Sequence, residues 1–104
     1  MILALLLAVV PPDTSCYEHV RSEAQFVLVS RESRGNPKAD NPRSSAFGCG
    51  QLIAKQRRHY GRILRINPNT TDPAEAIALM TAYITDRYGT DEKALTHHNR
   101  KGWY

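Results

Sequence analysis

The segment SRESRGNPKADNPRSSAFGCGQ (residues 30–51) begins at the end of a helical pattern and continues into a loop rich in glycine and proline. Gly35 and Pro37 end the helical pattern, because both residue types interrupt a helix. Glu32 lies at the junction of helix and loop, whereas Asp40 lies farther out in the loop. Loops held at the end of a rigid helix commonly carry catalytic side chains, so this segment is the leading candidate for a functional site.

The apolar residues before Glu32 indicate which side of the helix its side chain occupies. Val20, Ala24 and Leu28 recur at helical spacing, and Glu32 continues the same face. A carboxyl group at the end of an apolar stripe is partly removed from water, which raises its pKa and suits a general acid. The spacing alone favours the simpler alternative, an ordinary surface glutamate beside two arginines.

The length and composition indicate one small globular domain, and the sequence pattern lacks strands. The chain has 104 residues, of which 41% are hydrophobic and 23% are charged, as in soluble globular domains. No alternating strand pattern of useful length occurs. The net charge of +4 suits an anionic polymer, and both nucleic acid and the bacterial cell wall satisfy this condition.

Residues 1–12 form a separate apolar segment, in which MILALLLAVV precedes two prolines. A membrane span needs about 20 residues, so we expect no stable span here. The run has the length of the apolar region of a signal peptide, and it equally fits a short first helix packed on the core. Both interpretations stay open, and residues 13–104 form the expected domain.

Helix signals recur through the rest of the chain. Asp72 and Pro73 are a capping residue and a first-turn proline, and Gly89 is a suitable C-cap. The helices are expected at residues 15–33, 54–64, 73–88 and 90–98. The second of these should bury Leu52, Ile53, Gln56, Tyr60, Ile63 and Leu64 and expose a basic face made of Lys55, Arg57, Arg58 and Arg62.

Two groups of residues share their pattern with one known family. The first comprises Glu32-Ser33, Asn36-Pro37, Ala39, Asn41-Pro42, Ser45-Ala46, Gly48 and Gln51, and the second comprises Tyr83-Ile84, Arg87-Tyr88-Gly89, Ala94, His97-His98 and Gly102-Trp103-Tyr104. The chain thereby resembles lytic transglycosylases of the soluble lytic transglycosylase class, including phage-borne members. The resemblance implies a small, mostly helical lysozyme-like fold over residues 13–104.

The resemblance also implies a reaction and a partner. Glu32 would protonate the oxygen between N-acetylmuramic acid and N-acetylglucosamine, and would then deprotonate the muramoyl 6-hydroxyl to give a 1,6-anhydro product. The partners would be peptidoglycan glycan strands, with no cofactor, no metal and no nucleic acid. The location would be the bacterial periplasm and cell wall or a phage virion, where proteins of the virion or of a secretion machine are further possible partners.

Six residues are the expected substrate contacts under this resemblance: Ser33, Gln51, Tyr83, His98, Asn99 and Tyr104. Gln51 would bind substrate or position the loop. His98 stands where many family members have a tyrosine close to the catalytic glutamate. A charged histidine there would lower the pKa of Glu32 and weaken the acid, and Tyr83 or Tyr104 could supply the hydroxyl instead.

Three other classes of function compete with this one. A lysozyme-type hydrolase on the same fold would use Asp40 as a second carboxylate. A non-catalytic wall-binding component of a phage or secretion apparatus would need only the basic surface. A nucleic-acid binder would need aromatic residues interleaved with the basic run, where only Tyr60 qualifies.

Cys16 and Cys49 are the only cysteines, and they either pair or remain buried thiols. Cys49 with His97 or His98 could also form a nucleophile and base. Adjacent histidines on a helix diverge, so the sequence predicts no metal site. Gly50, beside Cys49, permits a close approach of the backbone either to a sugar or to a neighbouring helix.

Overall fold

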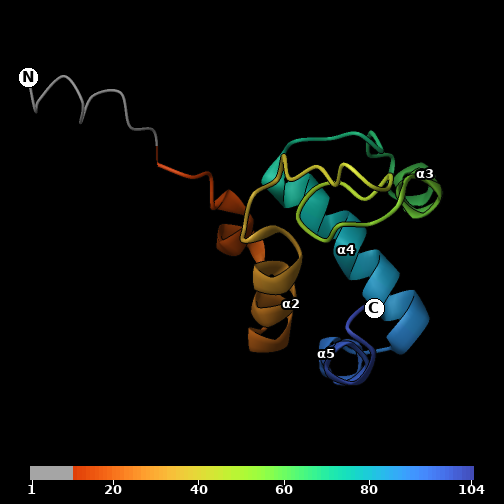
Figure 1. Ribbon diagram of the computed structural model, residues 1–104. Coiled ribbons are helices and arrows are strands. Elements are labelled where there is room, and N and C mark those ends of the chain that lie inside the picture. Colours follow the sequence, from red (N-terminus) through yellow and green to blue (C-terminus); the bar gives the residue numbers. More distant parts are fainter. Residues whose placement is uncertain (1–10) are drawn as a thin grey trace, which may run out of the picture.

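The computed structural model describes residues 11–104 of the chain, so the predictions for residues 1–10 lie outside the described part. A short 3₁₀ helix, η1 (Ser15–His19), precedes four α-helices: α2 (Glu23–Ser33), α3 (Ala54–Leu64), α4 (Pro73–Tyr88) and α5 (Asp91–Lys101) (Figure 1). Within residues 11–104, β-structure is limited to isolated bridges of Phe47 with Asp40 and Leu52. The mostly helical prediction is therefore confirmed.

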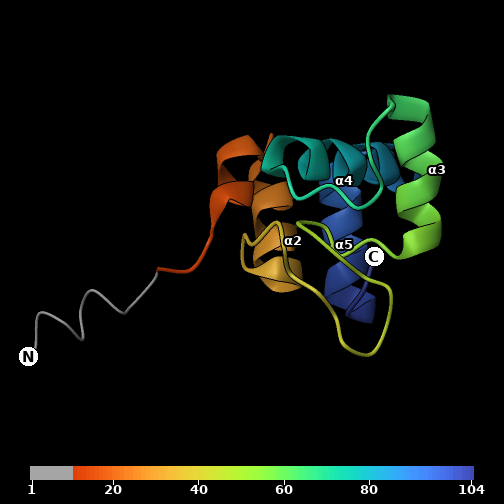
Figure 2. The same cartoon turned by 90° about the horizontal axis from the view of Figure 1, so that it is seen from above.

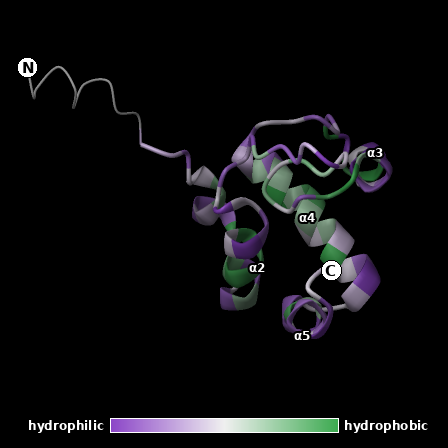
Figure 3. Cartoon of the chain, viewed as in Figure 1, coloured by the Kyte–Doolittle hydropathy of each residue, from purple (hydrophilic) through white to green (hydrophobic). Residues whose placement is uncertain are grey.

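Helix α4 is the centre of the domain, and η1, α3 and α5 all pack against it. In Figure 2, α4 runs across the top of the domain, with α2 near one end and α3 at the other, and α5 lies beside α2. Hydrophobic residues follow α4 along most of its length (Figure 3). Its buried side chains, which include Ile77, Met80 and Ile84, form the middle of the core.

Both ends of α4 confirm the sequence signals. The Asp72 side chain accepts a hydrogen bond from the backbone N–H of Glu75 at 2.9 Å, and Pro73 occupies the first turn. Gly89 ends the helix at a φ of 87°. Asp72 thus satisfies a donor that the first turn leaves without an intrahelical partner.

The predicted single helix over residues 15–33 is wrong, because the chain divides there into η1 and α2. Val20 is extended, with φ −68° and ψ 143°. Ser22 caps α2 by accepting the backbone N–H of Gln25 at 3.0 Å, while the Gln25 side chain accepts the N–H of Arg21 at 2.9 Å. These side-chain bonds to the backbone compete with helix continuation and start a new helix instead.

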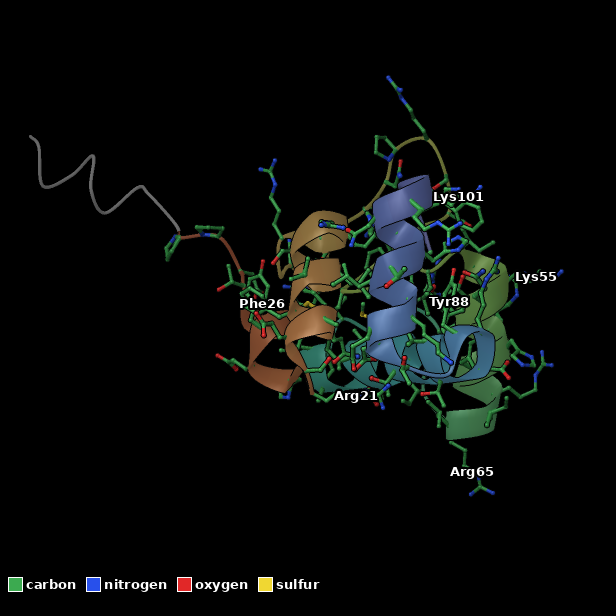
Figure 4. The ribbon with its side chains drawn as sticks, turned by 90° about the horizontal axis from the view of Figure 1, so that it is seen from below. Arg21, Phe26, Lys55, Arg65, Tyr88 and Lys101 are labelled. Carbon is green, nitrogen blue, oxygen red and sulfur yellow. A yellow bond between two sulfur atoms is a disulfide. The ribbon has the colours of Figure 1, made fainter. Side chains whose placement is uncertain are left out.

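Helix α3 has the predicted bounds, but its predicted faces are partly wrong. Ile53, Ile63 and Leu64 are 41%, 63% and 40% exposed, whereas Arg57 is buried. The Arg57 guanidinium donates to the carbonyls of Leu52, Ser45 and Pro68 and to the side chain of Asn69. Loops on both sides of α3 enclose this arginine, so it holds the loops together and does not face water. Lys55 and Arg65 do point outward, as Figure 4 shows.

Helix α5 continues three residues past the predicted end at His98. Thr90 caps its start by accepting the backbone N–H of Lys93. Gly102 ends it, with a φ of 81° and an N–H bonded to the carbonyl of His98. The glycine C-cap therefore sets the end of the helix, and the basic last turn is favourable near the helix C-terminus.

Cys16 and Cys49 form a disulfide with an S–S distance of 2.07 Å. This pairing decides between the alternatives for the two cysteines and excludes Cys49 as a free nucleophile. The bond connects η1 to the loop of residues 34–53 next to Gly50. A Cβ on Gly50 would lie 2.8 Å from the Met80 side chain and from the Tyr104 hydroxyl, so the close backbone approach at Gly50 is to the neighbouring helix and the chain end.

No helix within residues 11–104 is long and apolar enough to cross a membrane.

Candidate active site

Glu32 lies in the last turn of α2, where this helix packs against α5. Its Oε1 atom is 3.1 Å from Nε2 of His98, and the two side chains are only 19% and 11% exposed. The ion-pair geometry joins residues 66 positions apart in sequence. Helix packing therefore brings together the acid and the histidine that the two sequence motifs supply.

Burial raises the pKa of the Glu32 carboxyl above its usual value, and the nearby His98 opposes this shift. A rise in pKa is expected of a carboxyl at the end of an apolar stripe. The effect of desolvation on the Glu32 pKa is larger than the opposite effect of His98. A carboxyl that keeps its proton closer to neutral pH is suited to donate it to a substrate oxygen.

Tyr104 closes the site from the end of the chain. Its hydroxyl donates to the Gly50 carbonyl at 2.6 Å. Burial, together with the charge of Glu32, raises the pKa of Tyr104 well above its usual value. Tyr104 is therefore a neutral hydroxyl near Glu32, and it fastens the tail to the loop that follows α2.

Tyr83 is buried in the core and packs against Tyr104. It is 3% exposed, and its ring meets that of Tyr104 edge to face at a centroid distance of 5.4 Å. Burial raises the pKa of Tyr83 to about 12. One edge of Tyr83 lines a surface hollow of about 500 Å³ between α3 and α4, together with Tyr60 and Arg87.

Ser33 and Gln51 organise the loop between α2 and α3. The buried Ser33 hydroxyl donates to the Cys49 carbonyl at 2.8 Å. The Gln51 amide donates to the carbonyls of Ala39 and Gly48 at 2.9 and 3.0 Å, and Gln51 itself adopts a φ of 53°. These hydrogen bonds fit the second of the two roles expected for Gln51, which is to position the loop and not to bind substrate. For Ser33 the expected sugar contact does not fit, because its hydroxyl is buried against the backbone.

Arg31 is a site residue that the sequence pattern did not mark. Its Nη1 atom donates to Oδ1 of Asn99 at 2.6 Å and lies 3.2 Å from Nδ1 of His98. An arginine beside a glutamate on an exposed helix end is usually a solvated residue, and only the packing of α5 reveals these contacts. The expected site residue Asn99 is exposed and held by Arg31.

The other titratable candidates do not join this cluster. Asp40 is exposed in the outer loop, and its charge acts on the Arg57 guanidinium. His97 lies between the rings of Tyr88 and Trp103, at centroid distances of 5.2 and 4.5 Å. Within the part of the chain that the structure describes, no group of three or more His, Cys, Asp or Glu residues could hold a metal ion.

Comparison with protein-family models matches residues 13–98 to the Transglycosylase SLT domain. The comparisons with curated proteins and with solved structures gave no significant match. The matched residues include Glu32, His98 and the whole loop between α2 and α3. Because the match covers most of the chain, the chain belongs to the transglycosylase SLT domain family and is a peptidoglycan lytic transglycosylase with a lysozyme-like fold.

Proposed function

We propose that this domain cleaves the β-1,4 bond between N-acetylmuramic acid and N-acetylglucosamine with Glu32 as its single acid and base. The observation that carries the proposal is the position of Glu32. Its carboxyl is partly buried at the α2–α5 contact, its pKa is raised by desolvation, and a histidine nitrogen lies 3.1 Å away. Such an environment suits a group that must first hold a proton and later accept one.

In the first step the protonated Glu32 gives its proton to the glycosidic oxygen. The bond from that oxygen to C1 of the muramoyl sugar breaks, and N-acetylglucosamine leaves with a free 4-hydroxyl. Positive charge develops at C1. Glu32 is then a carboxylate, and it accepts a hydrogen bond from His98 when Nε2 carries the proton.

In the second step the Glu32 carboxylate removes the proton of the muramoyl 6-hydroxyl. That oxygen attacks C1 and closes the 1,6-anhydro ring, so Glu32 recovers its proton and no water is consumed. One carboxylate is sufficient for this sequence, in contrast to the two carboxylates of most glycosidases.

The surroundings of Glu32 suggest how the glycan is held. The proposed substrate contacts are His98, which contacts Glu32, Asn99, which contacts the neighbouring Arg31, and Tyr104, whose pKa is raised in part by the charge of Glu32. The exposed cations on α3 would favour approach to an anionic wall. The disulfide fits an oxidising location, such as the bacterial periplasm and wall or a phage virion, where virion or secretion-machine proteins would be partners.

Asp40→Asn tests this mechanism against the lysozyme-type hydrolase. We expect the rate of digestion of purified cell wall to stay within about twofold of the unmodified protein, because the proposed reaction uses no second carboxylate. Asp40 is exposed and lies outside the Glu32–His98 cluster. A fall of about 10²-fold or more in the Asp40→Asn variant would identify a second essential carboxylate and would favour the hydrolase.

A further inference from the structure

Two adjacent side chains of α2 approach the two ring nitrogens of one histidine. Glu32 Oε1 lies 3.1 Å from Nε2 of His98, and Arg31 Nη1 lies 3.2 Å from Nδ1. The same Nη1 atom donates to Asn99 at 2.6 Å. Because Nη1 carries two hydrogens, one can serve Asn99 and the other can serve His98.

This arrangement determines which nitrogen of His98 carries a proton. A guanidinium group is always protonated and can only donate, so Nδ1 must accept and cannot carry a hydrogen. A neutral imidazole with a bare Nδ1 carries its proton on Nε2, which is the atom that faces Glu32. An imidazolium would place an N–H group directly against the Arg31 donor.

We infer that Arg31 is a positioning residue that keeps His98 neutral, with its proton on Nε2, so that the catalytic proton stays on Glu32. The inference rests on the proposed role of Glu32 as the acid. What Arg31 determines is the location of the proton within the Glu32–His98 pair. Arg31 does this without touching the reacting atoms.

Two states of the pair hold the same number of protons. In one, Glu32 is protonated and His98 is neutral, and in the other Glu32 is a carboxylate and His98 is an imidazolium. Because the proton count is equal, pH does not choose between them. Only the first state can protonate the glycosidic oxygen, and only the second needs a hydrogen on Nδ1, where Arg31 opposes it through both its donor and its positive charge.

The other groups that face His98 do not favour the neutral imidazole over the imidazolium. The chain end contributes Tyr104, whose ring centroid lies 6.4 Å from that of His98, and burial keeps its hydroxyl neutral by raising its pKa. Helix α2 contributes Glu32, which favours the imidazolium, and Arg31, which opposes it. Arg31 therefore compensates for a histidine at the position where the resemblance expects a tyrosine, which carries one donor and no positive charge.

The first test is the pH dependence of cell-wall digestion by an Arg31→Met variant, which removes the charge and the donors. We expect the plateau rate to fall at least about tenfold, the effect of one unit in a proton equilibrium. The alkaline limb should also move to higher pH, because the pair then holds its proton on His98. Arg100→Met is the matched control, since it removes an exposed arginine from α5, and it should leave both features unchanged. An Arg31→Met variant with the unmodified rate and profile would overturn the inference.

The second test detects the proton directly, by ¹⁵N NMR of protein labelled in its histidines. The signals of His98 are assigned by their loss in His98→Tyr. We expect a bare Nδ1 and a protonated Nε2 in the unmodified protein at neutral pH, and an imidazolium in Arg31→Met over the pH range of activity. A proton on Nδ1 in the unmodified protein would contradict the inference. This NMR measurement does not depend on activity. Its result therefore tests the inference about Arg31 even if the proposed reaction is wrong.

A double-variant comparison shows whether Arg31 acts through His98. In a His98→Tyr background no imidazolium can form, so Arg31→Met should change the rate by less than about twofold, against about tenfold with His98 present. Asn99→Ala, measured alone, isolates the other contact of Arg31. An equal loss in both backgrounds would assign Arg31 to Asn99 or to the fold and would overturn the inference.

Discussion

Glu32→Gln should reduce the rate of cell-wall digestion by about 10²- to 10⁴-fold, the usual contribution of general acid–base catalysis. Glutamine keeps the size of the side chain and its ability to accept a hydrogen bond from His98. It cannot donate a proton to the glycosidic oxygen or remove one from the 6-hydroxyl. Both steps therefore fail together. A Glu32→Gln variant that digests wall at a near-normal rate would remove Glu32 from the reaction.

The same substitution should leave the protein at least as stable as before. Burial raises the pKa of Glu32 in the folded state, so the folded protein binds the proton more tightly than the unfolded chain. Stability then falls as pH rises from the unfolded pKa, about 4.5, through the raised folded pKa. Glutamine has no such penalty, so the melting temperature of Glu32→Gln should equal that of the unmodified protein in acid and equal or exceed it at neutral pH. A lower melting temperature at neutral pH would show that the carboxylate stabilises the fold.

Loss of the disulfide should cost about 3 to 4 kcal/mol of stability, the loop-entropy value for cysteines that lie 33 residues apart. For a domain of this size that is a large share of the total stability. Denaturant titration of the Cys16→Ala/Cys49→Ala double variant measures the loss.

Reduction supplies the control for the disulfide. Reductant should destabilise the unmodified protein by a similar amount and should leave the double variant unaffected. The Cys49 carbonyl accepts from Ser33, and the next carbonyl, that of Gly50, accepts from Tyr104. Activity should therefore decline before global unfolding. A loss below about 1 kcal/mol would contradict a structural role for the bond.

Local signals in the sequence were sufficient for most of the secondary structure. Asp72, Pro73 and Gly89 define α4, because each acts on the backbone within a few residues of its own position: Asp72 through its side chain, and Pro73 and Gly89 through their backbone dihedral angles. The break between η1 and α2 is not predicted by the sequence, because the helical spacing of Val20, Ala24 and Leu28 continues from the break into α2. It depends on reciprocal bonds among Arg21, Ser22 and Gln25, and those bonds are reinforced from α5, where Asp91 accepts from Arg21 and Ser22.

The faces of α3 could not be predicted from periodicity because loops enclose one side of that helix. An arginine is normally placed on the solvent side, but Arg57 finds three backbone carbonyls and one amide oxygen there. Buried charge is tolerated where hydrogen bonds satisfy it. The acceptors that bind the Arg57 guanidinium belong to the folded loops, so the sequence of α3 alone does not reveal them.

The candidate site was predictable in part. The apolar stripe before Glu32 was compatible with desolvation, but the spacing alone favoured a surface glutamate. The motif resemblance was needed to favour a site at Glu32 and to place His98 opposite it. The contact of Arg31 with His98 was not predictable, because Arg31 belongs to neither motif and only the packing of α2 against α5 brings the two side chains together. Ser33 is expected at the substrate, but its hydroxyl donates hydrogen bonds to the backbone carbonyls of Cys49 and Val29.

The mass of the released muropeptides tests the central claim most directly. Purified peptidoglycan is digested with the unmodified domain, and the soluble products are separated and weighed. The single-residue mechanism at Glu32 predicts products that end in 1,6-anhydromuramic acid, each lighter by one water than the corresponding reducing product. Products that carry only reducing muramic ends would show that water attacks C1, and they would contradict the transglycosylase reaction proposed for this site.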